Sequence, residues 1–456
     1  VLSSTAVPYH PNSPCEDITV NTPISRRQLL RGAAAATVAG SVGASAAACG
    51  SGSDPNKLTY WSMWKEGEPQ AKVLAKAIDS FTKDTGIEVS VEWKGREVAK
   101  QLAPTLNTKN VPADLIDSAD RFVKSTFVAT KQSLDLSGVY DAKVPGESGS
   151  KISDVIPAKY RDLTVADDSV WMVPYEVISE QLWFDGNRLE NIADNPPTEW
   201  DEFIDLLDKL KDDRGAGPIA LDGDVADYTG YWTYHVVLRD LGPGAFAEAA
   251  TDKTGRKLAD PSFRDAVKKI EQLVSGGYFA KGYMSSKFPS LQQKWAAGKS
   301  DLLLMGSWAP SETAPSVGKD FEYRSFAFPE GAAKEVTSGI ALIGFAVPAQ
   351  AGNPEGAQKF IEHFMGAERI KGISSKAKNI TPRPDIEVPA ELADMKKTLD
   401  DSKTHLSMDG IKLDHEDWYT KVFQPLNTDL FSGKASADDF VSRLASDSGE
   451  FWKRNG

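Results

Sequence analysis

Cysteine, histidine and net positive charge are all scarce in this chain. It has two cysteines and five histidines in 456 residues, and neither residue type shows metal-ligand spacing. Lys and Arg number 52 against 65 Asp and Glu, which gives a formal net charge of -13. Because phosphate binding needs a basic face, this balance argues against a nucleic-acid partner. We expect no metal and no cofactor.

The sequence motifs of several enzyme classes are also missing. There is no Gly-x-Ser-x-Gly, no His-Glu-x-x-His and no phosphate-binding P-loop. Residues 215–220 imitate a dinucleotide fingerprint, but Pro218 stands where the next helix would begin, which indicates a turn. Among 65 acidic residues, the carboxylate pair of a glycoside hydrolase cannot be recognised. We therefore predict that the chain is not an enzyme, with a secreted glycoside hydrolase as an alternative.

An apolar run near the start indicates export. Residues 32–48 are rich in Ala, Val and Gly, and they form a run shorter than the ~20 residues that span a bilayer. The preceding Ser25-Arg26-Arg27-Gln28-Leu29-Leu30 is typical of a twin-arginine export signal, although Arg26 and Arg27 could be a chance basic pair. The polar, Pro-rich residues before Ser25 are expected to be an extended leader or a misplaced start.

Cys49 closes the apolar run as Ala46-Ala47-Ala48-Cys49, which resembles a lipobox. We expect residues 1–49 to be a lipoprotein signal, with lipid on Cys49 anchoring the chain to the outer face of the cytoplasmic membrane. Cleavage after an Ala-x-Ala site, with an idle Cys49, is the alternative. Residues 50–56 would then be a flexible tether. The mature chain would have one cysteine and no internal disulfide.

The length exceeds what one hydrophobic core supports, so two lobes are expected. Alternating and helical apolar patterns predict a β-α-β-α-β order, which implies a mostly parallel sheet with helices on both faces. The predicted strands cover residues 57–61, 87–93, 113–116, 170–173, 181–184, 301–305 and 340–347. The predicted helices cover residues 70–83, 99–106, 200–211, 231–241, 261–275, 291–297 and 354–365, with a mainly helical tail. Thr198, with Asp201 three residues later, is expected to cap the helix that starts at Trp200.

Several short segments, in this order, resemble the family 1 extracellular solute-binding proteins over residues 57–450. They include Thr59-Tyr60-Trp61-Ser62-Met63-Trp64, Asp120-Arg121-Phe122, Met172-Val173-Pro174-Tyr175, Pro196-Pro197-Thr198-Glu199-Trp200 and Met305-Gly306-Ser307-Trp308. The resemblance implies an α/β, two-lobe, periplasmic-binding-protein-like II fold that closes about a hinge, with the ligand in the interlobe cleft. The expected first lobe is 57–172 with 340–381, and the second is 173–339 with 382–456. Crossings are expected near Met172, Gly339 and Pro382.

The same resemblance implies the substrate-binding component of an ABC importer: a monomer that captures a carbohydrate and docks on permease subunits. A pyranose has a C–H face that packs on aromatic rings and a hydroxyl rim that suits carboxylates and guanidinium groups. Both residue types follow predicted strands here, where open α/β sheets bind ligands. The candidate ligand-binding residues are Trp61, Trp64, Glu66, Asp120, Arg121, Tyr175, Glu176, Asp222, Asp224, Tyr231, Trp232, Trp308, Gly339, Arg383 and Trp418.

Several candidates also have a purely structural alternative. Trp61 and Trp418 could be core residues, Asp120 could cap a helix, and Glu176 could simply be solvated. The acidic loop around Asp222 lacks the glycine and glutamate of a calcium loop. That loop leaves open the same fold with a polyamine, peptide or other non-sugar solute.

Overall fold

The computed structural model describes residues 54–455, so the predicted export signal with Arg26 and Arg27, and the predicted lipid site at Cys49, lie outside the described residues. The described residues belong to one structural unit. Within residues 54–455, no helix has both the length and the apolar character needed to cross a bilayer.

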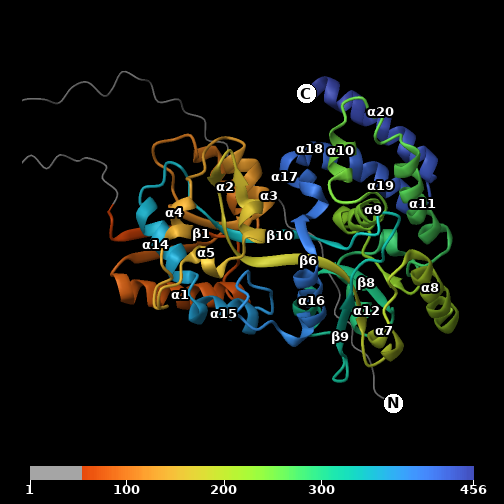
Figure 1. The fold of residues 1–456 in the computed structure, drawn as a ribbon, viewed down its shortest axis with the longest axis horizontal. Helices are drawn as coiled ribbons and strands as arrows, with labels where there is room; N and C mark the ends of the chain where they lie inside the picture. The colour runs from red at the N-terminus through yellow and green to blue at the C-terminus, as the bar shows by residue number, and fades with distance from the viewer. Residues whose placement is uncertain (1–53, 456) are drawn as a thin grey trace, which may run out of the picture. The chain divides into compact units, whose positions relative to one another are not determined.

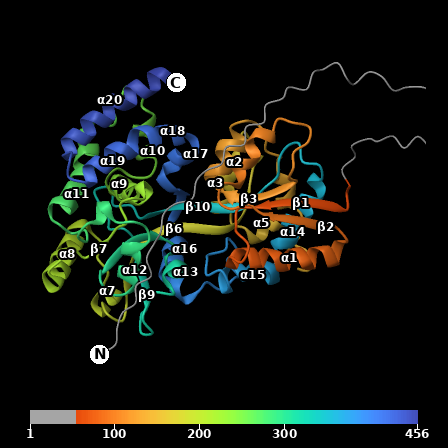
Figure 2. The ribbon, with the colours of Figure 1, turned by 180° about the vertical axis from the view of Figure 1, so that it is seen from behind.

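A mixed sheet of nine strands organises the described chain. Its order is β2-β1-β3-β10-β6-β8-β7, with β11 beside β10 and β9 beside β6; β4 and β5 form a separate two-stranded sheet. The strands are β1 (Lys57–Ser62), β2 (Glu88–Trp93), β3 (Leu115–Ala119), β4 (Val165–Ala166), β5 (Ser169–Val170), β6 (Val173–Asp185), β7 (Ile219–Ala220), β8 (Leu302–Gly306), β9 (Tyr323–Phe326), β10 (Thr337–Ala346) and β11 (Lys403–Leu406). Figure 2 shows β3, β10 and β6 side by side.

The prediction of a mostly parallel sheet is right at the start of the chain and wrong at its centre. Strand β1 pairs in parallel with β2 and β3. In contrast, β10 is antiparallel to both β3 and β6, and β6 is antiparallel to β8 and β9. Strand β6 leads the chain away from β1–β3 and β10 leads it back, so the two central strands run in opposite directions.

Strand β6 was predicted as two strands separated at Pro174, and this prediction is wrong. One continuous strand covers Val173–Asp185. The register against β10 shifts between Ile343 and Gly344, opposite Pro174. A bulge tolerates a proline because the missing N–H group has no ladder partner there. A Cβ atom on Gly344 would lie 2.5 Å from the carbonyl oxygen of Val173, so this approach needs glycine.

We call lobe 1 the group made of strands β1–β5 with the helices of residues 57–172 and 354–375. These helices are α1 (Pro69–Thr85), α2 (Val98–Leu102), α3 (Asp120–Val123), the π-turn η2 (Lys124–Val128), α4 (Ser137–Asp141), α5 (Ile152–Val155), α6 (Ala158–Arg161), α14 (Pro354–Phe364) and α15 (Ala367–Ser375). Helix α1 begins with Pro69 and buries Val73, Leu74 and Phe81 on one face, and it ends where Gly86 adopts φ 76°.

We call lobe 2 the group made of β7–β9 and β11 with the remaining helices (Figure 1). They are α7 (Glu190–Asp194), α8 (Trp200–Arg214), α9 (Ala226–Leu241), α10 (Ala245–Thr251), α11 (Pro261–Ser275), α12 (Ser290–Ala296), α13 (Ala309–Thr313), α16 (Ala393–Asp401), η6 (Ser407–Gly410), α17 (Ile411–Asp414), α18 (Glu416–Trp418), η7 (Tyr419–Phe423), α19 (Gln424–Phe431) and α20 (Ala437–Asn455). The predicted cap of α8 by Thr198 and Asp201 is wrong by one residue, since Glu199 and Glu202 form the capping box.

Strands β6 and β10 join the two lobes (Figure 1). The first half of β6, up to Ser179, pairs with β10, and the second half, from Glu180, pairs with β8 and β9. This pairing favours a boundary inside β6 rather than at Met172. Residues 376–392 form the third connection. The exact lobe boundaries remain a proposal.

Candidate functional site

Asp120 ties the end of β3 to the central strand β10. It is buried, its Oδ1 accepts the N–H of Arg121 at 2.6 Å, and its Oδ2 accepts the N–H of Leu342 at 2.9 Å. Burial raises the pKa of Asp120 to about 6, although both hydrogen bonds favour the charged carboxylate. The contacts fix the start of α3 and so place the Arg121 side chain between the lobes.

Arg121 faces an acidic residue of lobe 2. Its Nη1 lies 3.7 Å from Asp227 of helix α9. Asp227 also accepts from Lys412 Nζ at 2.6 Å and from Gln424 Nε2 at 3.0 Å. Burial opposes ionisation of Asp227, but the charge and hydrogen bond of Lys412 together with the charge of Arg121 lower the pKa of Asp227 overall. A charged cluster therefore spans the two lobes at this point.

A cavity of about 240 Å³ adjoins this cluster. Its lining residues are Arg121, Val225, Ala226, Asp227, Lys412, Glu416, Tyr419, Thr420 and Gln424. Tyr419 is buried, and its hydroxyl has no hydrogen-bond partner within residues 54–455. A Cβ atom on Gly230 would collide with that hydroxyl, so Gly230 makes room for the ring. The cavity is bordered by an aromatic residue and by charges of both signs.

Glu180 and Tyr231 extend the polar region along β6 and α9. Both are buried, and Glu180 Oε1 accepts from Ser407 Oγ at 3.3 Å. Burial raises the pKa of Glu180 to about 7, against the opposing charge of Lys412. Burial also raises the pKa of Tyr231, and the neighbouring charge of Glu180 adds to the effect. The phenol of Tyr231 therefore stays neutral near these charges.

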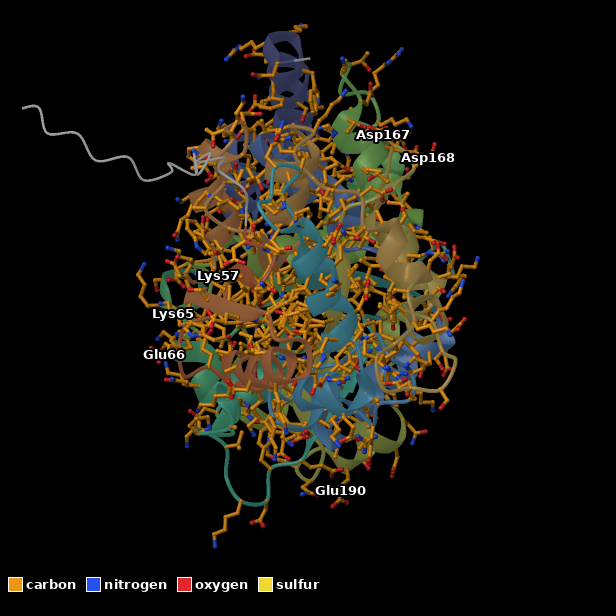
Figure 3. All side chains as sticks on the ribbon, turned by 90° about the vertical axis from the view of Figure 1, so that its left-hand side faces the viewer. Lys57, Lys65, Glu66, Asp167, Asp168 and Glu190 are labelled. Carbon is orange, nitrogen blue, oxygen red and sulfur yellow. The ribbon has the colours of Figure 1, made fainter. Side chains whose placement is uncertain are left out.

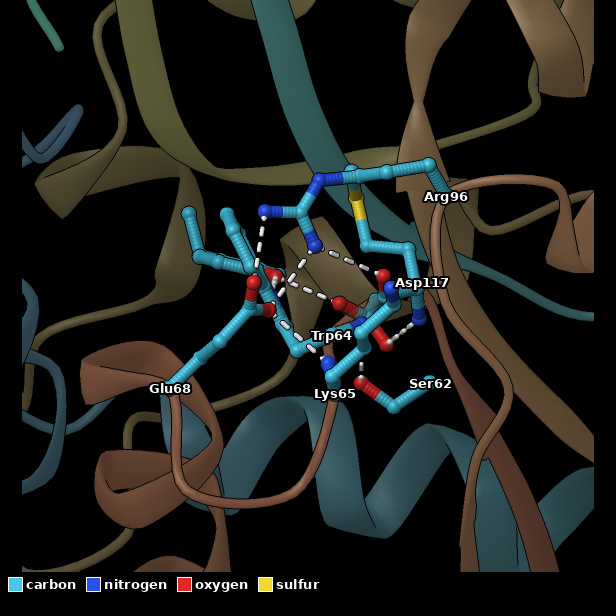
Figure 4. Close-up of polar contacts among 8 residues, drawn as sticks. Ser62, Trp64, Lys65, Glu68, Arg96 and Asp117 are labelled. Carbon is cyan, nitrogen blue, oxygen red and sulfur yellow. Dashed lines mark hydrogen bonds and ion pairs between the residues drawn. The ribbon is translucent and has the colours of Figure 1, made fainter. Parts of the chain in front are cut away.

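A second polar group lies at the end of β1 (Figure 4). Trp64 Nε1 donates to the hydroxyl of Tyr175 at 2.7 Å, and that hydroxyl donates to Asp117 Oδ2 at 2.6 Å. The guanidinium of Arg96 lies 4.4 Å from the centre of the Trp64 ring and donates to both oxygens of Glu68 at 2.8 and 3.1 Å. Trp64 is therefore held by a hydrogen bond at its edge and a cation on its face.

In the described part of the chain, some buried polar atoms on elements of both lobes and on the joining strand β6 have no hydrogen-bond partner. Within residues 54–455, buried atoms without a hydrogen-bond partner include Ser118 Oγ, Glu176 Oε2, Gln292 Oε1 and Ser307 Oγ. These come from β3, β6, α12 and the end of β8. The other polar atom of the Gln292 side chain, Nε2, donates to Glu312 at 2.9 Å. Burial raises the pKa of Glu176 and of Glu312, and the positive charge of Arg96 acts in the opposite direction on both. Since buried polar groups are normally satisfied, we infer that these atoms mark a region between the lobes, called the crevice below, where a polar solute would find hydrogen-bond partners.

A family comparison identifies the protein class. The family model described as "Bacterial extracellular solute-binding protein" matches residues 64–369. The chain belongs to this family. The predicted resemblance is confirmed, and the crevice between the lobes is the natural candidate for the solute site of this binding protein.

Relatives and solved structures agree with the family. The solute-binding protein is 24% identical over 387 residues to the diacetylchitobiose binding protein NgcE of Streptomyces coelicolor, covering 78% of this chain and 80% of the relative. It is also 25% identical over 187 residues to a probable sugar-binding periplasmic protein of Brucella suis. That alignment covers 39% of this chain and 42% of the relative.

Two solved structures share the fold. A chitin oligosaccharide binding protein superposes with a TM-score of 0.70 at 16% identity, covering 87% of this chain and all of the other. The solute-binding protein RafE in complex with raffinose gives 0.67 at 17% identity, covering 86% and 99%. The predicted periplasmic-binding-protein fold is therefore confirmed.

The structure brings several predicted residues of this solute-binding protein to the crevice. Asp120, Arg121 and Tyr231 surround the charged cluster, and Glu176 lies among the unsatisfied atoms. Trp64 and Tyr175 form the second polar group, but Tyr175 is fully buried against Phe345 and Phe364 and does not form the predicted cleft wall. Trp308 is half-buried, with its ring packed over Gly306 at the end of β8. Gly339 lies on β10 and accepts from Ser179 Oγ through its carbonyl oxygen.

Other predicted residues have local structural roles. Asp222 accepts from the N–H groups of Leu291 and Gln292 at the start of α12, and Asp224 accepts from the N–H of Phe288. Trp61 donates to Glu92 on the surface of β2 and is covered by Lys94. Glu66 is exposed at the surface (Figure 3).

Three predicted residues are buried in structural contacts, and the proposed site does not include them. Trp232 is fully buried in lobe 2, against Phe279 and Phe328. Trp418 is also fully buried, and its Nε1 donates to Ser448 Oγ at 2.9 Å. Arg383 is buried in an ion-pair clamp with Glu147 and Asp385 at 3.0 and 2.6 Å.

Sequence reasoning missed Arg96, Glu180, Asp227, Lys412 and Tyr419. Asp227 follows the acidic loop around Asp222, which gives it no feature of its own, and Lys412 stands in an unremarkable Ile-Lys-Leu-Asp stretch. Tyr419 directly follows the predicted Trp418, and successive helical residues point about 100° apart. Trp418 therefore packs inside lobe 2, and Tyr419 borders the cavity beside Arg121.

Proposed function

We propose that this solute-binding protein captures a mono- or oligosaccharide in the crevice between its lobes and delivers it to the transmembrane subunits of an ABC importer. The named ligand of the Streptomyces coelicolor relative is diacetylchitobiose. The two solved structures are a chitin oligosaccharide binder and a raffinose complex. Binding, rather than catalysis, is the role that the family and these relatives support.

The observation that carries the proposal is the set of buried, unsatisfied hydrogen-bonding atoms beside aromatic rings. Hydroxyl, carboxyl and amide oxygens without partners can exchange hydrogen bonds with a hydroxyl-rich solute. Arg121 adds a guanidinium that makes charge-assisted bonds. Tyr231 and Tyr419 supply rings for the C–H face of a sugar.

Delivery to an importer completes the proposal. We propose that residues 1–49 direct export by the twin-arginine route, that lipid on Cys49 anchors the mature chain, and that residues 50–56 tether it. The monomer then closes about β6 and β10 around its sugar, and the closed form docks on the permease.

Calorimetric titration of the full chain tests the sugar assignment. The probes are N,N′-diacetylchitobiose, raffinose and galactose. We expect saturable binding of at least one, weakened about tenfold or more by Arg121→Ala, because a charge-assisted hydrogen bond contributes about 1.5–3 kcal/mol. Glu66→Gln is the matched control on an exposed charge and should leave the affinity within twofold. Binding that ignores Arg121→Ala would refute the site, and a chain that binds no sugar would refute the function.

One observation favours a second candidate, a cationic polyamine. Within residues 54–455, the side-chain hydrogen bonds of Glu180 and Glu312 come only from the neutral Ser407 and Gln292, and Glu176 Oε2 has no partner. An ammonium group would be stabilised by these carboxyl groups in their ionised form, which Glu176 adopts only above about pH 8 and Glu180 only above about pH 7. Spermidine belongs in the same titration, and tighter binding of spermidine than of every sugar would favour this alternative.

A further inference from the structure

The ion pairs that join the two lobes all have the same polarity. Within the described chain, each pair between an element of lobe 1 and an element of lobe 2 takes its cation from lobe 1 and its acid from lobe 2. The four pairs are Lys124–Asp414 at 2.8 Å, Arg121–Asp227 at 3.7 Å, Lys159–Asp400 at 3.7 Å and Lys100–Glu416 at 3.8 Å.

The pairs lie on both sides of the strands that join the lobes. Three of them connect α2, α3 and η2 with α9, α17 and α18, and α17 packs directly on α3 and η2. The fourth connects α6 with α16, where Lys159 Nζ also donates to the carbonyl oxygen of Leu399 at 2.9 Å. The attraction is assigned to these four pairs, because the facing surface of lobe 2 also carries the cation Lys412, which pairs with Asp227 and lies near Arg121.

We propose that these ion pairs form an electrostatic latch that favours the approach of the two lobes and thereby contributes to solute affinity. Each pair is partly exposed, so each is expected to change the ratio of closed to open molecules by only about twofold to fivefold. A solute gains affinity when its binding-competent state is already populated. Affinity for an uncharged sugar therefore falls with added salt, although the sugar itself carries no charge.

The first test measures the interlobe distance without any solute. Fluorophores are placed on Lys83→Cys in α1 and Asp213→Cys in α8, in the full chain with Cys15 and Cys49 changed to serine. Both labelled positions are exposed. Raising NaCl from about 10 mM to about 1 M shortens the screening length from about 30 Å to about 3 Å. We expect the distance distribution to shift toward longer values.

Charge variants make this test specific. Lys124→Glu should lower the closed-to-open ratio at low salt, because it places two acids in contact. The exchanged pair Lys124→Glu with Asp414→Lys should restore it. Lys72→Glu on α1, which makes the same change of charge away from the interlobe contact, should have no effect. The latch proposal would be overturned if the distance distribution did not change with salt. It would also be overturned if the exchanged pair had a closed-to-open ratio as low as that of Lys124→Glu alone.

The second test uses N,N′-diacetylchitobiose and therefore rests on the proposed function. We expect its dissociation constant to rise at least about threefold between low and high salt, and to rise less in Lys124→Glu. Equal affinity at both salt concentrations would count against the latch. If this sugar does not bind at all, the sugar assignment fails while the distance measurement still decides the latch.

Discussion

Replacing Glu176 with glutamine should remove a specific part of the pH dependence of stability. Glu176 lies on β6 with 3% of its surface exposed, and Oε2 has no hydrogen-bond partner within the described residues. Burial raises the pKa of Glu176 from its ordinary value of 4.5 to about 8. The native state therefore keeps a proton that the unfolded chain loses at lower pH, so stability falls as pH rises between these two values.

The magnitude follows from the size of that shift. A difference of about 3.5 pKa units corresponds to about 5 kcal/mol once the pH is well above 8, and to almost nothing below 4.5. Between about pH 6 and pH 8, wild type should lose about 2 kcal/mol of unfolding free energy through this group. Glutamine resembles the protonated carboxyl group in shape and carries no titrating proton, so Glu176→Gln should lack this loss.

Urea unfolding followed by tryptophan fluorescence at the two pH values measures the difference. The comparison of wild type with Glu176→Gln isolates this group, because all other titrating residues are shared. Glu66→Gln, at an exposed glutamate, is the matched control and should behave like wild type. An equal pH dependence in wild type and Glu176→Gln would show that the carboxyl group is not buried as described.

Two further substitutions test other parts of the structure. Gly230→Ala puts a methyl group against the Tyr419 hydroxyl, so we expect the Tyr419 ring to be displaced. Calorimetry should then show an affinity for the bound sugar that is weaker by at least about tenfold. An unchanged affinity would show that Tyr419 is not part of the site. Arg383→Ala leaves the Glu147 carboxylate without its buried cation, so we expect urea unfolding to show a free energy of unfolding about 2–4 kcal/mol lower. The affinity for the solute should not change. A lower affinity with an unchanged free energy of unfolding would show that Arg383 belongs to the binding site.

Local patterns in the sequence correctly predict β1, β2, β3, α1, α2 and α14 of lobe 1, but none of the short elements between residues 117 and 169. The alternation in β1 and the spacing of Val73, Leu74 and Phe81 in α1 are strong because each element buries one face. The continuous strand β6 is not predictable in this way. Pro174 normally ends a strand, and the bulge that accommodates it depends on Gly344, 170 residues further along the chain.

The candidate site is only partly predictable for the same reason. Asp120 and Arg121 stand directly after a strand, where local order alone places them at the edge of the sheet. Arg383 is held stiffly by two prolines, but its direction is decided by Glu147, which is 236 residues away in sequence. Trp418 and Tyr419 are equally plausible aromatics, and only the packing of the helices decides which of them reaches the cavity.

The most direct test of the central claim is a crystal structure of the protein with the tightest sugar found in the titrations. The account predicts a sugar between the lobes, with its hydroxyl groups bonded to Arg121 and a ring against Tyr419 or Tyr231. A sugar found elsewhere, for example in the cavity of about 1130 Å³ along α1 and α15 on lobe 1, would contradict it.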